Sequence, residues 1–246
     1  MERILRIGSV PYLNAKPLVR HVRGNITLLE PAPLAQAFRR GDFDLALIPV
    51  VECFLEPDVL ILDQVAIGCQ GPVYSVILVH EKPLSEIQSI AVDAASLTSV
   101  TLLRILLRKH WKLEPTLVQD GLEADAQLLI GDRALHFRQQ FPKKQLTDLG
   151  AAWRSFTGLP FVFAVWAVQP LSDLSLEELE HFRCLSMKGL NDRKSLAKNA
   201  EELVYLEQWI RYDLGGFQKE ALRRFAQEVA EAGIFVEHVQ TNLDFV

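Results

Sequence analysis

The sequence predicts an α/β protein of two lobes with a helical C-terminal segment. Short apolar segments alternate with helical patterns near its start, which is typical of parallel sheets with crossover helices. Two longer apolar segments, Val73–His80 and Phe161–Val168, lie far apart in the chain. We expect them to be hinge strands that cross between the lobes. From Leu174 to Gly233 the pattern is helical, with breaks at Gly189 and Gly215-Gly216.

The first fifty residues predict a small parallel sheet. Apolar runs predict its strands, and Pro or Gly marks where helices begin and end. The expected elements are strands at Ile4–Ile7, Ile26–Leu29 and Leu45–Ile48, and helices at Ala15–His21 and Pro33–Arg40.

A second set of strands follows Val73–His80 and predicts the second lobe. Its elements are strands at Ile90–Val92, Pro115–Val118 and Ala126–Ile130, and an amphipathic helix at Val100–Trp111. We assign residues 1–85 and 168–246 to the first lobe and residues 86–167 to the second. A ligand cleft is expected between the lobes, where small-molecule sites commonly lie.

Composition excludes several classes of protein. The 246 residues carry a net charge of −5 without a basic stripe, which argues against nucleic acid as a partner. No apolar run is long enough to span a membrane, and no secretory signal is evident, so a cytoplasmic location is expected. Nothing in the sequence indicates an oligomeric state. Cys53, Cys69 and Cys184 form neither a metal motif nor a disulfide framework, and we expect buried thiols.

The segment Arg6–Pro17 predicts a site for a small anion. An apolar strand runs into Gly8-Ser9 and then, through Asn14, into a helix start at Pro17. Ligands bind at the carboxyl ends of strands in open α/β folds, and free N–H groups at a helix start suit a carboxylate. Lys16, a cation near a helix start, fits better beside an anion. An ordinary strand-to-helix turn is the alternative.

A second anion site is predicted at Asp93–Ser99, again between a strand and a helix. Ser96, Thr98 and Ser99 supply three hydroxyls, of which helix capping explains one. We therefore expect this segment to contact the ligand.

Two further polar residues are candidates for the site. Asp132 follows an apolar strand and either caps the next helix or accepts a hydrogen bond from a substrate hydroxyl. Ser75 is polar within an apolar strand, and its partner is either backbone or ligand. His136 is expected on the surface. Phe161, Phe163 and Trp166 are expected in the core, with one side of their strand as the alternative wall of the cleft.

Common catalytic signatures are absent from the chain. It contains no Gly-x-x-x-x-Gly-Lys-[Ser/Thr], no Gly-x-Gly-x-x-Gly, no His-Glu-x-x-His and no Gly-x-Ser-x-Gly.

Five ordered motifs together resemble the chorismate dehydratase family of the futalosine route to menaquinone. These are Gly8–Pro17, Asp44–Pro49, Leu97–Leu103, Ile130–Leu135 and Thr157–Trp166. The resemblance implies the fold of type II periplasmic solute-binding proteins, used as a cytoplasmic enzyme. It implies dehydration of chorismate, a dicarboxylate, to 3-[(1-carboxyvinyl)oxy]benzoate, with neither cofactor nor metal.

The resemblance also implies roles for individual residues. Asn14 matches an active-site asparagine and Ser75 a substrate-contacting serine, while Thr98-Ser99 matches a carboxylate-binding pair and Asp132 a Gly-Asp loop. In the family a small polar residue often follows the proline that matches Pro49, whereas this chain has Val50-Val51. A ligand contact made by the backbone would survive this difference, and one made by a side chain would not.

The reaction itself stays open at two points. The base is either Asp132 or the enolpyruvyl carboxylate of the substrate. The competing functions are 1,4-dihydroxy-6-naphthoate synthase, which would need a histidine in the cleft, and a solute-binding protein without activity.

Overall fold

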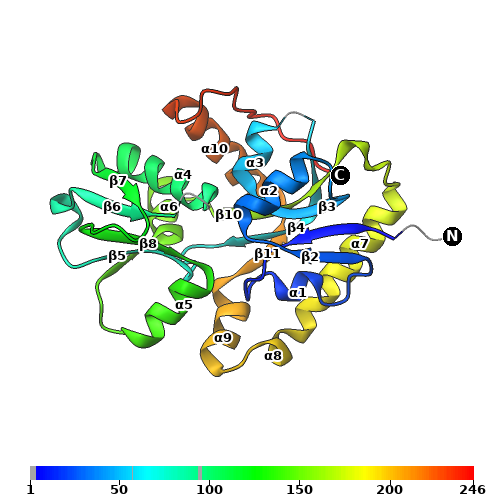
Figure 1. Ribbon diagram of the computed structural model, residues 1–246, viewed down its shortest axis with the longest axis horizontal. Coiled ribbons are helices and arrows are strands. Elements are labelled where there is room, and N and C mark those ends of the chain that lie inside the picture. Colours follow the sequence, from blue (N-terminus) through cyan, green and yellow to red (C-terminus); the bar gives the residue numbers. More distant parts are fainter. Residues whose placement is uncertain (1–3, 57, 94–95) are drawn as a thin grey trace.

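The computed structural model describes residues 4–56, 58–93 and 96–246 and shows two lobes, each built on its own sheet (Figure 1). The six-stranded sheet of the first lobe has the order β11-β4-β10-β3-β1-β2. The five-stranded sheet of the second lobe has the order β7-β6-β8-β5-β9. The predicted two-lobed α/β architecture is confirmed.

The first sheet is parallel at one edge and antiparallel elsewhere. β1, β2 and β3 run parallel, as their short crossover helices require, whereas β10 is antiparallel to both β3 and β4. Its strands are β1 (Arg6–Ser9), β2 (Asn25–Leu28), β3 (Leu45–Pro49), β4 (Leu60–Cys69), β10 (Phe161–Val168) and β11 (Arg211–Leu214). The helices α1 (Lys16–Val19), α2 (Pro31–Arg39) and α3 (Val50–Leu55) follow its first three strands.

The second lobe is a smaller mixed sheet with helices around it. β5 is antiparallel to β8 and β9, and β6 is parallel to β7 and β8. Its strands are β5 (Val76–His80), β6 (Ser89–Val92), β7 (Thr116–Gln119), β8 (Ala126–Ile130) and β9 (Leu146–Asp148). Its helices are α4 (Leu97–Ile105), which continues as the π-helix η2 (Leu106–Trp111), α5 (Gly131–Gln140) and α6 (Leu149–Thr157).

The lobe boundaries differ from those expected at 85/86 and 167/168. β5 pairs only within the second sheet, and β10 lies in the first. The chain therefore crosses between the lobes at residues 70–75 and again at 158–160. The sequence analysis assigns no element to residues 50–72 and therefore lacks β4, the neighbour of β10. It expects the β-branched run at 73–80 in the first lobe, whereas this run forms β5 in the sheet of the second lobe.

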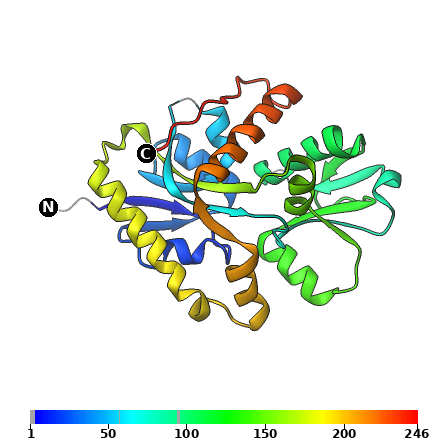
Figure 2. The same ribbon diagram turned by 180° about the vertical axis from the view of Figure 1, so that it is seen from behind.

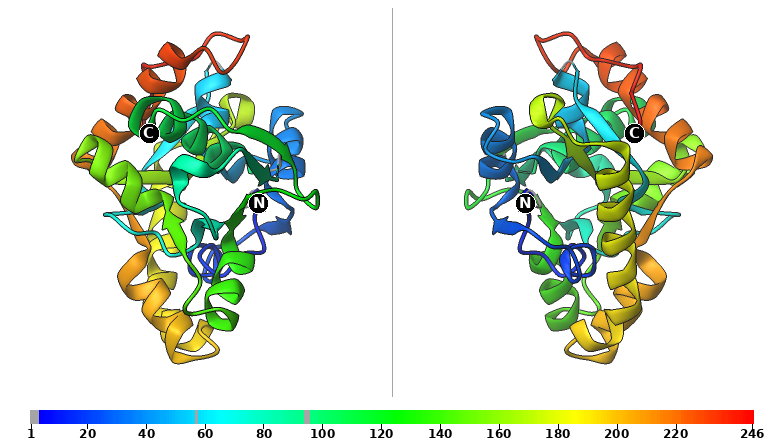
Figure 3. Two further views of the ribbon diagram at one scale, coloured as in Figure 1. Left: turned by 90° about the vertical axis from the view of Figure 1, so that its left-hand side faces the viewer. Right: turned by 90° about the vertical axis from the view of Figure 1, so that its right-hand side faces the viewer.

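The C-terminal segment is largely helical, as predicted, and also adds the edge strand β11. It contains α7 (Leu176–Lys188), α8 (Arg193–Leu196), α9 (Ala200–Val204), the π-helix η5 (Tyr205–Trp209) and α10 (Gly216–Ala232). Seen from behind, α7 lies along the first lobe, while α10 extends from the first lobe toward the second (Figure 2). The end views show α5, α1 and the segment from α8 to α9 on the lower side of the molecule (Figure 3).

Aromatic side chains form the centre of the core where the lobes meet. Trp153, Phe161 and Phe225 come from α6, β10 and α10 and pack edge to face, with ring centroids 4.8–5.6 Å apart. Cys53 and Cys69 are buried as expected, but Cys184 is exposed because it lies on the outer face of α7. In the part of the chain that the structure describes, no helix is both long and apolar enough to cross a membrane.

Candidate active site

A cavity lies where the two lobes face each other, and it encloses about 650 Å³ including its mouth. Its lining is mainly apolar, and the hydroxyl and amide groups in it come from different segments of the chain. Five first-lobe regions line it: the loop after β1, the start of α2 at Pro31, the end of β3, Ile67 on β4, and Phe163 with Ala164 on β10. The lobe crossing at residues 73–76, the first turn of α4 and the turn from β8 to α5 complete the wall. β10 thus contributes Phe163 and Ala164 to the lining, while Phe161, Phe163 and Trp166 are buried, as expected for core residues.

The three hydroxyls predicted at the second anion site all line this cavity. Ser96, Thr98 and Ser99 are each at most 6% exposed and form the start of α4. Ser96 occupies the N-cap position, yet its side chain makes no capping hydrogen bond. Its hydroxyl therefore remains available to a ligand, together with the first-turn N–H groups of α4. Of the predicted segment 93–99, residues 94 and 95 lie outside the described residues.

Thr98 also joins the two lobes. Its Oγ1 accepts a hydrogen bond from the backbone N–H of Val51, in the first turn of α3, at 3.4 Å. The contact uses only the backbone of Val51, so the apolar side chains after Pro49 leave it intact.

Asn14 and Ser75 also line the cavity and come from separate parts of the chain. Asn14 comes from the loop between β1 and α1, and Ser75 from the lobe crossing. Ser75 Oγ accepts a hydrogen bond from the hydroxyl of Tyr205 at 2.8 Å, and the Asn14 side chain lies near the same hydroxyl. Asn14 Oδ1 is buried without a protein partner, which leaves an acceptor for a ligand.

Ser9 is not among the residues that line the cavity. Ser9 lies at the end of β1 and is fully buried inside the first lobe, with no hydrogen-bond partner for its Oγ. The sequence could not decide this, because neighbouring side chains of a strand point to opposite faces.

Asp132 lies beside the cavity rather than in its wall. Its Oδ1 accepts a hydrogen bond from the backbone N–H of Leu13 at 3.1 Å, so it links the second lobe to the residue before Asn14. Together with Lys16 and the exposed His136, it borders a separate polar recess between α1, α5 and α9. The carboxylate therefore holds the loop that carries Asn14.

Three tyrosines that the sequence interpretation did not single out surround Asn14. Tyr12 lines the cavity, and its hydroxyl donates to Glu30 Oε2 at 2.7 Å. Tyr205 and Tyr212 are buried, and the Tyr212 hydroxyl donates to the backbone oxygen of Asn14 at 3.0 Å. Tyr12 stands within the motif Gly8–Pro17 and could have been noticed there. No local pattern marks the other two.

The cavity is electrically neutral in its own side chains. Among the described residues that line it, none is Asp, Glu, His, Lys or Arg. Burial raises the pKa of Tyr205 far above its usual value, so its phenol keeps its proton. The described residues also contain no group of three His, Cys, Asp or Glu that could hold a metal ion. The site offers hydrogen bonds and shape rather than a charged acid–base pair.

Comparison with known proteins assigns this architecture to a family. A family model described as menaquinone biosynthesis matches residues 5–231. The chain belongs to this family. Two of its curated relatives are named as enzymes, and this chain is likewise an enzyme. One is a chorismate dehydratase of Thermus thermophilus, 30% identical over 65% of this chain and 68% of the relative. Another is a chorismate dehydratase of Campylobacter jejuni, 31% identical over 43% of this chain and 50% of the relative.

Solved structures show the fold of the family member. A protein of Archaeoglobus fulgidus aligns with a TM-score of 0.75 at 17% identity, over 94% of this chain and 98% of its own. The alkanesulfonate-binding protein of Xanthomonas axonopodis aligns with a TM-score of 0.67 at 14% identity, over 97% of this chain and 96% of its own. The predicted periplasmic-binding-protein-like fold is thereby confirmed.

Proposed function

We propose that this chain removes water from chorismate and so forms 3-[(1-carboxyvinyl)oxy]benzoate for menaquinone biosynthesis. The observation that carries the proposal is the cavity between the lobes, whose lining includes hydroxyls from α4 and, from other segments, Asn14 and Ser75. Two relatives named chorismate dehydratase support the choice of substrate.

These two sets of polar groups suit the two carboxylates of chorismate. Ser96, Thr98 and Ser99 bind one carboxylate, together with the free N–H groups at the start of α4. Asn14 and Ser75 bind the other side of chorismate, at its ether side chain or its leaving hydroxyl. Hydrogen bonds to a carboxylate contribute about 1.5–3 kcal/mol each, so several of them replace a cationic side chain.

The chemistry requires the loss of one proton and one hydroxyl from adjacent ring carbons. The C–H bond at the ether-bearing carbon breaks, its electron pair forms the new ring double bond, and the neighbouring C–O bond breaks. The hydroxyl leaves with a proton as water, and the ring becomes aromatic. Because aromatisation supplies the driving force, holding the substrate in the reactive conformation and excluding solvent supply much of the rate.

We assign the base to the enolpyruvyl carboxylate of the substrate, folded back over the ring. No carboxylate or histidine occurs among the described residues that line the cavity, and Asp132 is occupied with the N–H of Leu13. Asp132 is then a positioning residue for the Asn14 loop. The lack of a histidine in the described lining also disfavours the naphthoate synthase alternative.

Incubation of the purified protein with chorismate tests the proposal. We expect the diene absorbance of chorismate to be replaced by that of a substituted benzoate, with one product formed per substrate consumed. Asn14→Ala and Ser75→Ala should abolish most of the turnover. Binding of chorismate without turnover would instead indicate a solute-binding protein and would overturn the assignment.

A further inference from the structure

The hydroxyl of Tyr205 forms a buried junction behind the cavity wall. Tyr205 is 1% exposed and begins the π-helix η5, a type of turn found frequently at functional sites. Its hydroxyl donates to Ser75 Oγ at 2.8 Å and lies near the Asn14 side chain. One buried phenol thus lies beside two polar groups of the cavity lining that are distant from each other in the sequence.

The contacts at this junction give Asn14 and Ser75 different roles. Asn14 Oδ1 has no protein partner, and its side chain lies near the phenol oxygen. The phenol O–H donates to Ser75 Oγ. The serine hydroxyl, having accepted this bond, keeps its own proton for the cavity. Asn14 therefore offers an acceptor to the ligand, while Ser75 offers a donor.

The same C-terminal segment also fixes the backbone on both sides of the junction. Trp209, at the end of η5, stacks on Tyr74 with ring centroids 5.5 Å apart and planes 9° from parallel. Tyr74 directly precedes Ser75 in the lobe crossing. Tyr212 on β11 donates to the backbone oxygen of Asn14 at 3.0 Å. The segment from η5 to β11 consequently determines where both polar groups point.

We propose that Tyr205 is a positioning residue of the active site, which holds Ser75 by a hydrogen bond and packs beside Asn14. The proposal rests on the proposed function, since it assumes that these two groups act on the substrate. It assigns to the C-terminal segment a role in the reaction besides completing the first lobe.

Tyr205→Phe removes the hydroxyl and keeps the packing of the ring. We expect kcat to fall by about 10-fold or more, with KM changed less than about threefold, because mispositioned groups affect the transition state more than binding. The melting temperature should stay close to that of the wild type. Tyr74→Phe is the matched control: it removes a phenol oxygen one residue from Ser75, keeps the stacking on Trp209, and should retain wild-type kcat.

A double-mutant cycle and a crystal structure separate positioning from a merely structural role. In the Ser75→Ala background, Tyr205→Phe should cost little further activity, because coupled groups are not additive. Wild-type kcat in Tyr205→Phe, or full additivity with Ser75→Ala, would overturn the proposal. If the wild type does not convert chorismate, the proposed function fails and activity can no longer test Tyr205. The positioning role is then tested by the crystal structure of Tyr205→Phe alone. Unchanged orientations of Asn14 and Ser75 would refute the positioning role, and altered ones would support it.

Discussion

Substitutions of Asp132 distinguish two roles for its carboxylate: the base that removes the proton, and the group that positions the loop carrying Asn14. Asp132→Asn keeps an oxygen that accepts the N–H of Leu13 but is no longer basic. Because we assign proton removal to the substrate, we expect this variant to retain kcat within about threefold. Asp132→Ala loses the acceptor as well and should lower kcat/KM by about 10-fold. Steady-state assays with chorismate measure both. An inactive Asp132→Asn enzyme that still binds chorismate would return the role of base to this carboxylate.

Thr98 combines substrate binding with a contact between the lobes. Thr98→Val keeps the shape and removes the hydroxyl that accepts the N–H of Val51. We expect KM to rise by about 10-fold with a smaller change in kcat, because a hydrogen bond to a carboxylate is lost in ground state and transition state alike. Thr98→Ser retains the hydroxyl and serves as the control. A Thr98→Val enzyme with the KM of Thr98→Ser would show that the hydroxyl contacts no substrate.

Among the elements, those buried on both faces were predicted best. β10 and β8 were predicted residue for residue, because Phe161–Val168 is a continuous apolar run and Ala126–Ile130 is apolar except at Gln127. β11 was missed, since Arg211–Leu214 is a polar edge strand inside a helical region. β4 was missed because Asp63 and Gln64 interrupt its apolar pattern, and Gln64 has a positive φ of 68°.

The same contrast applies to the candidate site. Asn14, Thr98 and Ser99 could be found because each lies where a strand leads into a helix, a local arrangement that the chain order reveals. Tyr205 could not, because its partner Ser75 is 130 positions away and only the tertiary fold brings them together. Asp132 was found as a residue, but its contact with Leu13 depends on how the lobes meet.

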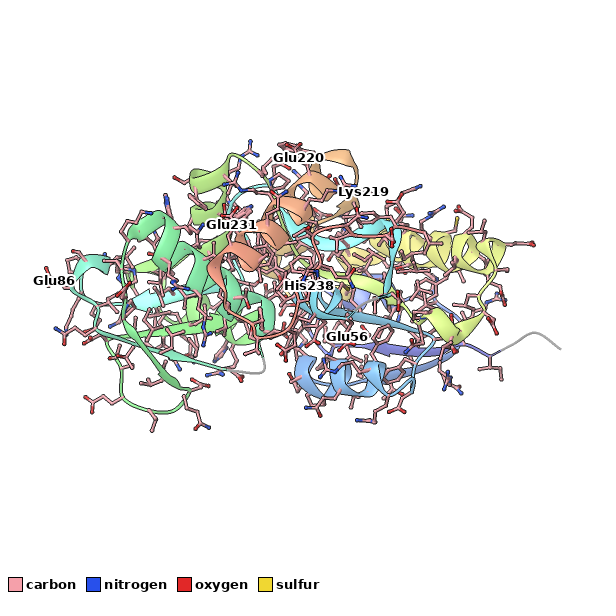
Figure 4. The ribbon with its side chains drawn as sticks, turned by 90° about the horizontal axis from the view of Figure 1, so that it is seen from above. Glu56, Glu86, Lys219, Glu220, Glu231 and His238 are labelled. Carbon is pink, nitrogen blue, oxygen red and sulfur yellow. The ribbon has the colours of Figure 1, made fainter. Side chains whose placement is uncertain are left out.

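Between elements, η2 and α10 are joined by an ion-pair cluster that links the second lobe to the C-terminal helix. Lys109 Nζ lies 2.9 Å from Glu231 and 3.4 Å from Glu228, and Figure 4 labels Glu231 at the end of α10 beside the second lobe. Glu228 is 4% exposed and also pairs with Arg224. Lys109→Met should lower the free energy of unfolding by about 1 kcal/mol, since a buried carboxylate loses one of its two cations.

Urea denaturation measures this effect, and Glu231→Gln provides the comparison. Glu231 has a side chain that is 65% exposed, so removing its charge should change the free energy of unfolding by less than about 0.5 kcal/mol. Equal losses in both variants would show that the buried carboxylate does not depend on Lys109.

For the whole molecule, the site is complete only where both lobes face each other, and Gly131 tests whether their approach limits catalysis. Gly131 belongs to the second lobe and has φ +54°, and a Cβ placed there would lie 3.4 Å from the Tyr12 ring of the first lobe. Gly131→Ala therefore strains the backbone and also places a methyl group in van der Waals contact with the facing lobe, which leaves Tyr12 no room to move closer. Gly121, in the same lobe, has φ +89° and nothing within 4 Å of a Cβ. Gly121→Ala carries the backbone strain without the contact.

Both variants should lose stability by a similar amount, about 1 kcal/mol, which thermal unfolding measures. Only Gly131→Ala should also lose kcat/KM for chorismate, by about fivefold or more, because the alanine methyl group opposes the approach of Tyr12 in the closed state. The product should then raise the melting temperature of Gly121→Ala more than that of Gly131→Ala, since ligand binding stabilises the closed form in proportion to affinity. Equal kcat/KM in the two variants would mean that the lobes reach the reactive arrangement without the Gly131–Tyr12 contact, and that closure does not limit the reaction.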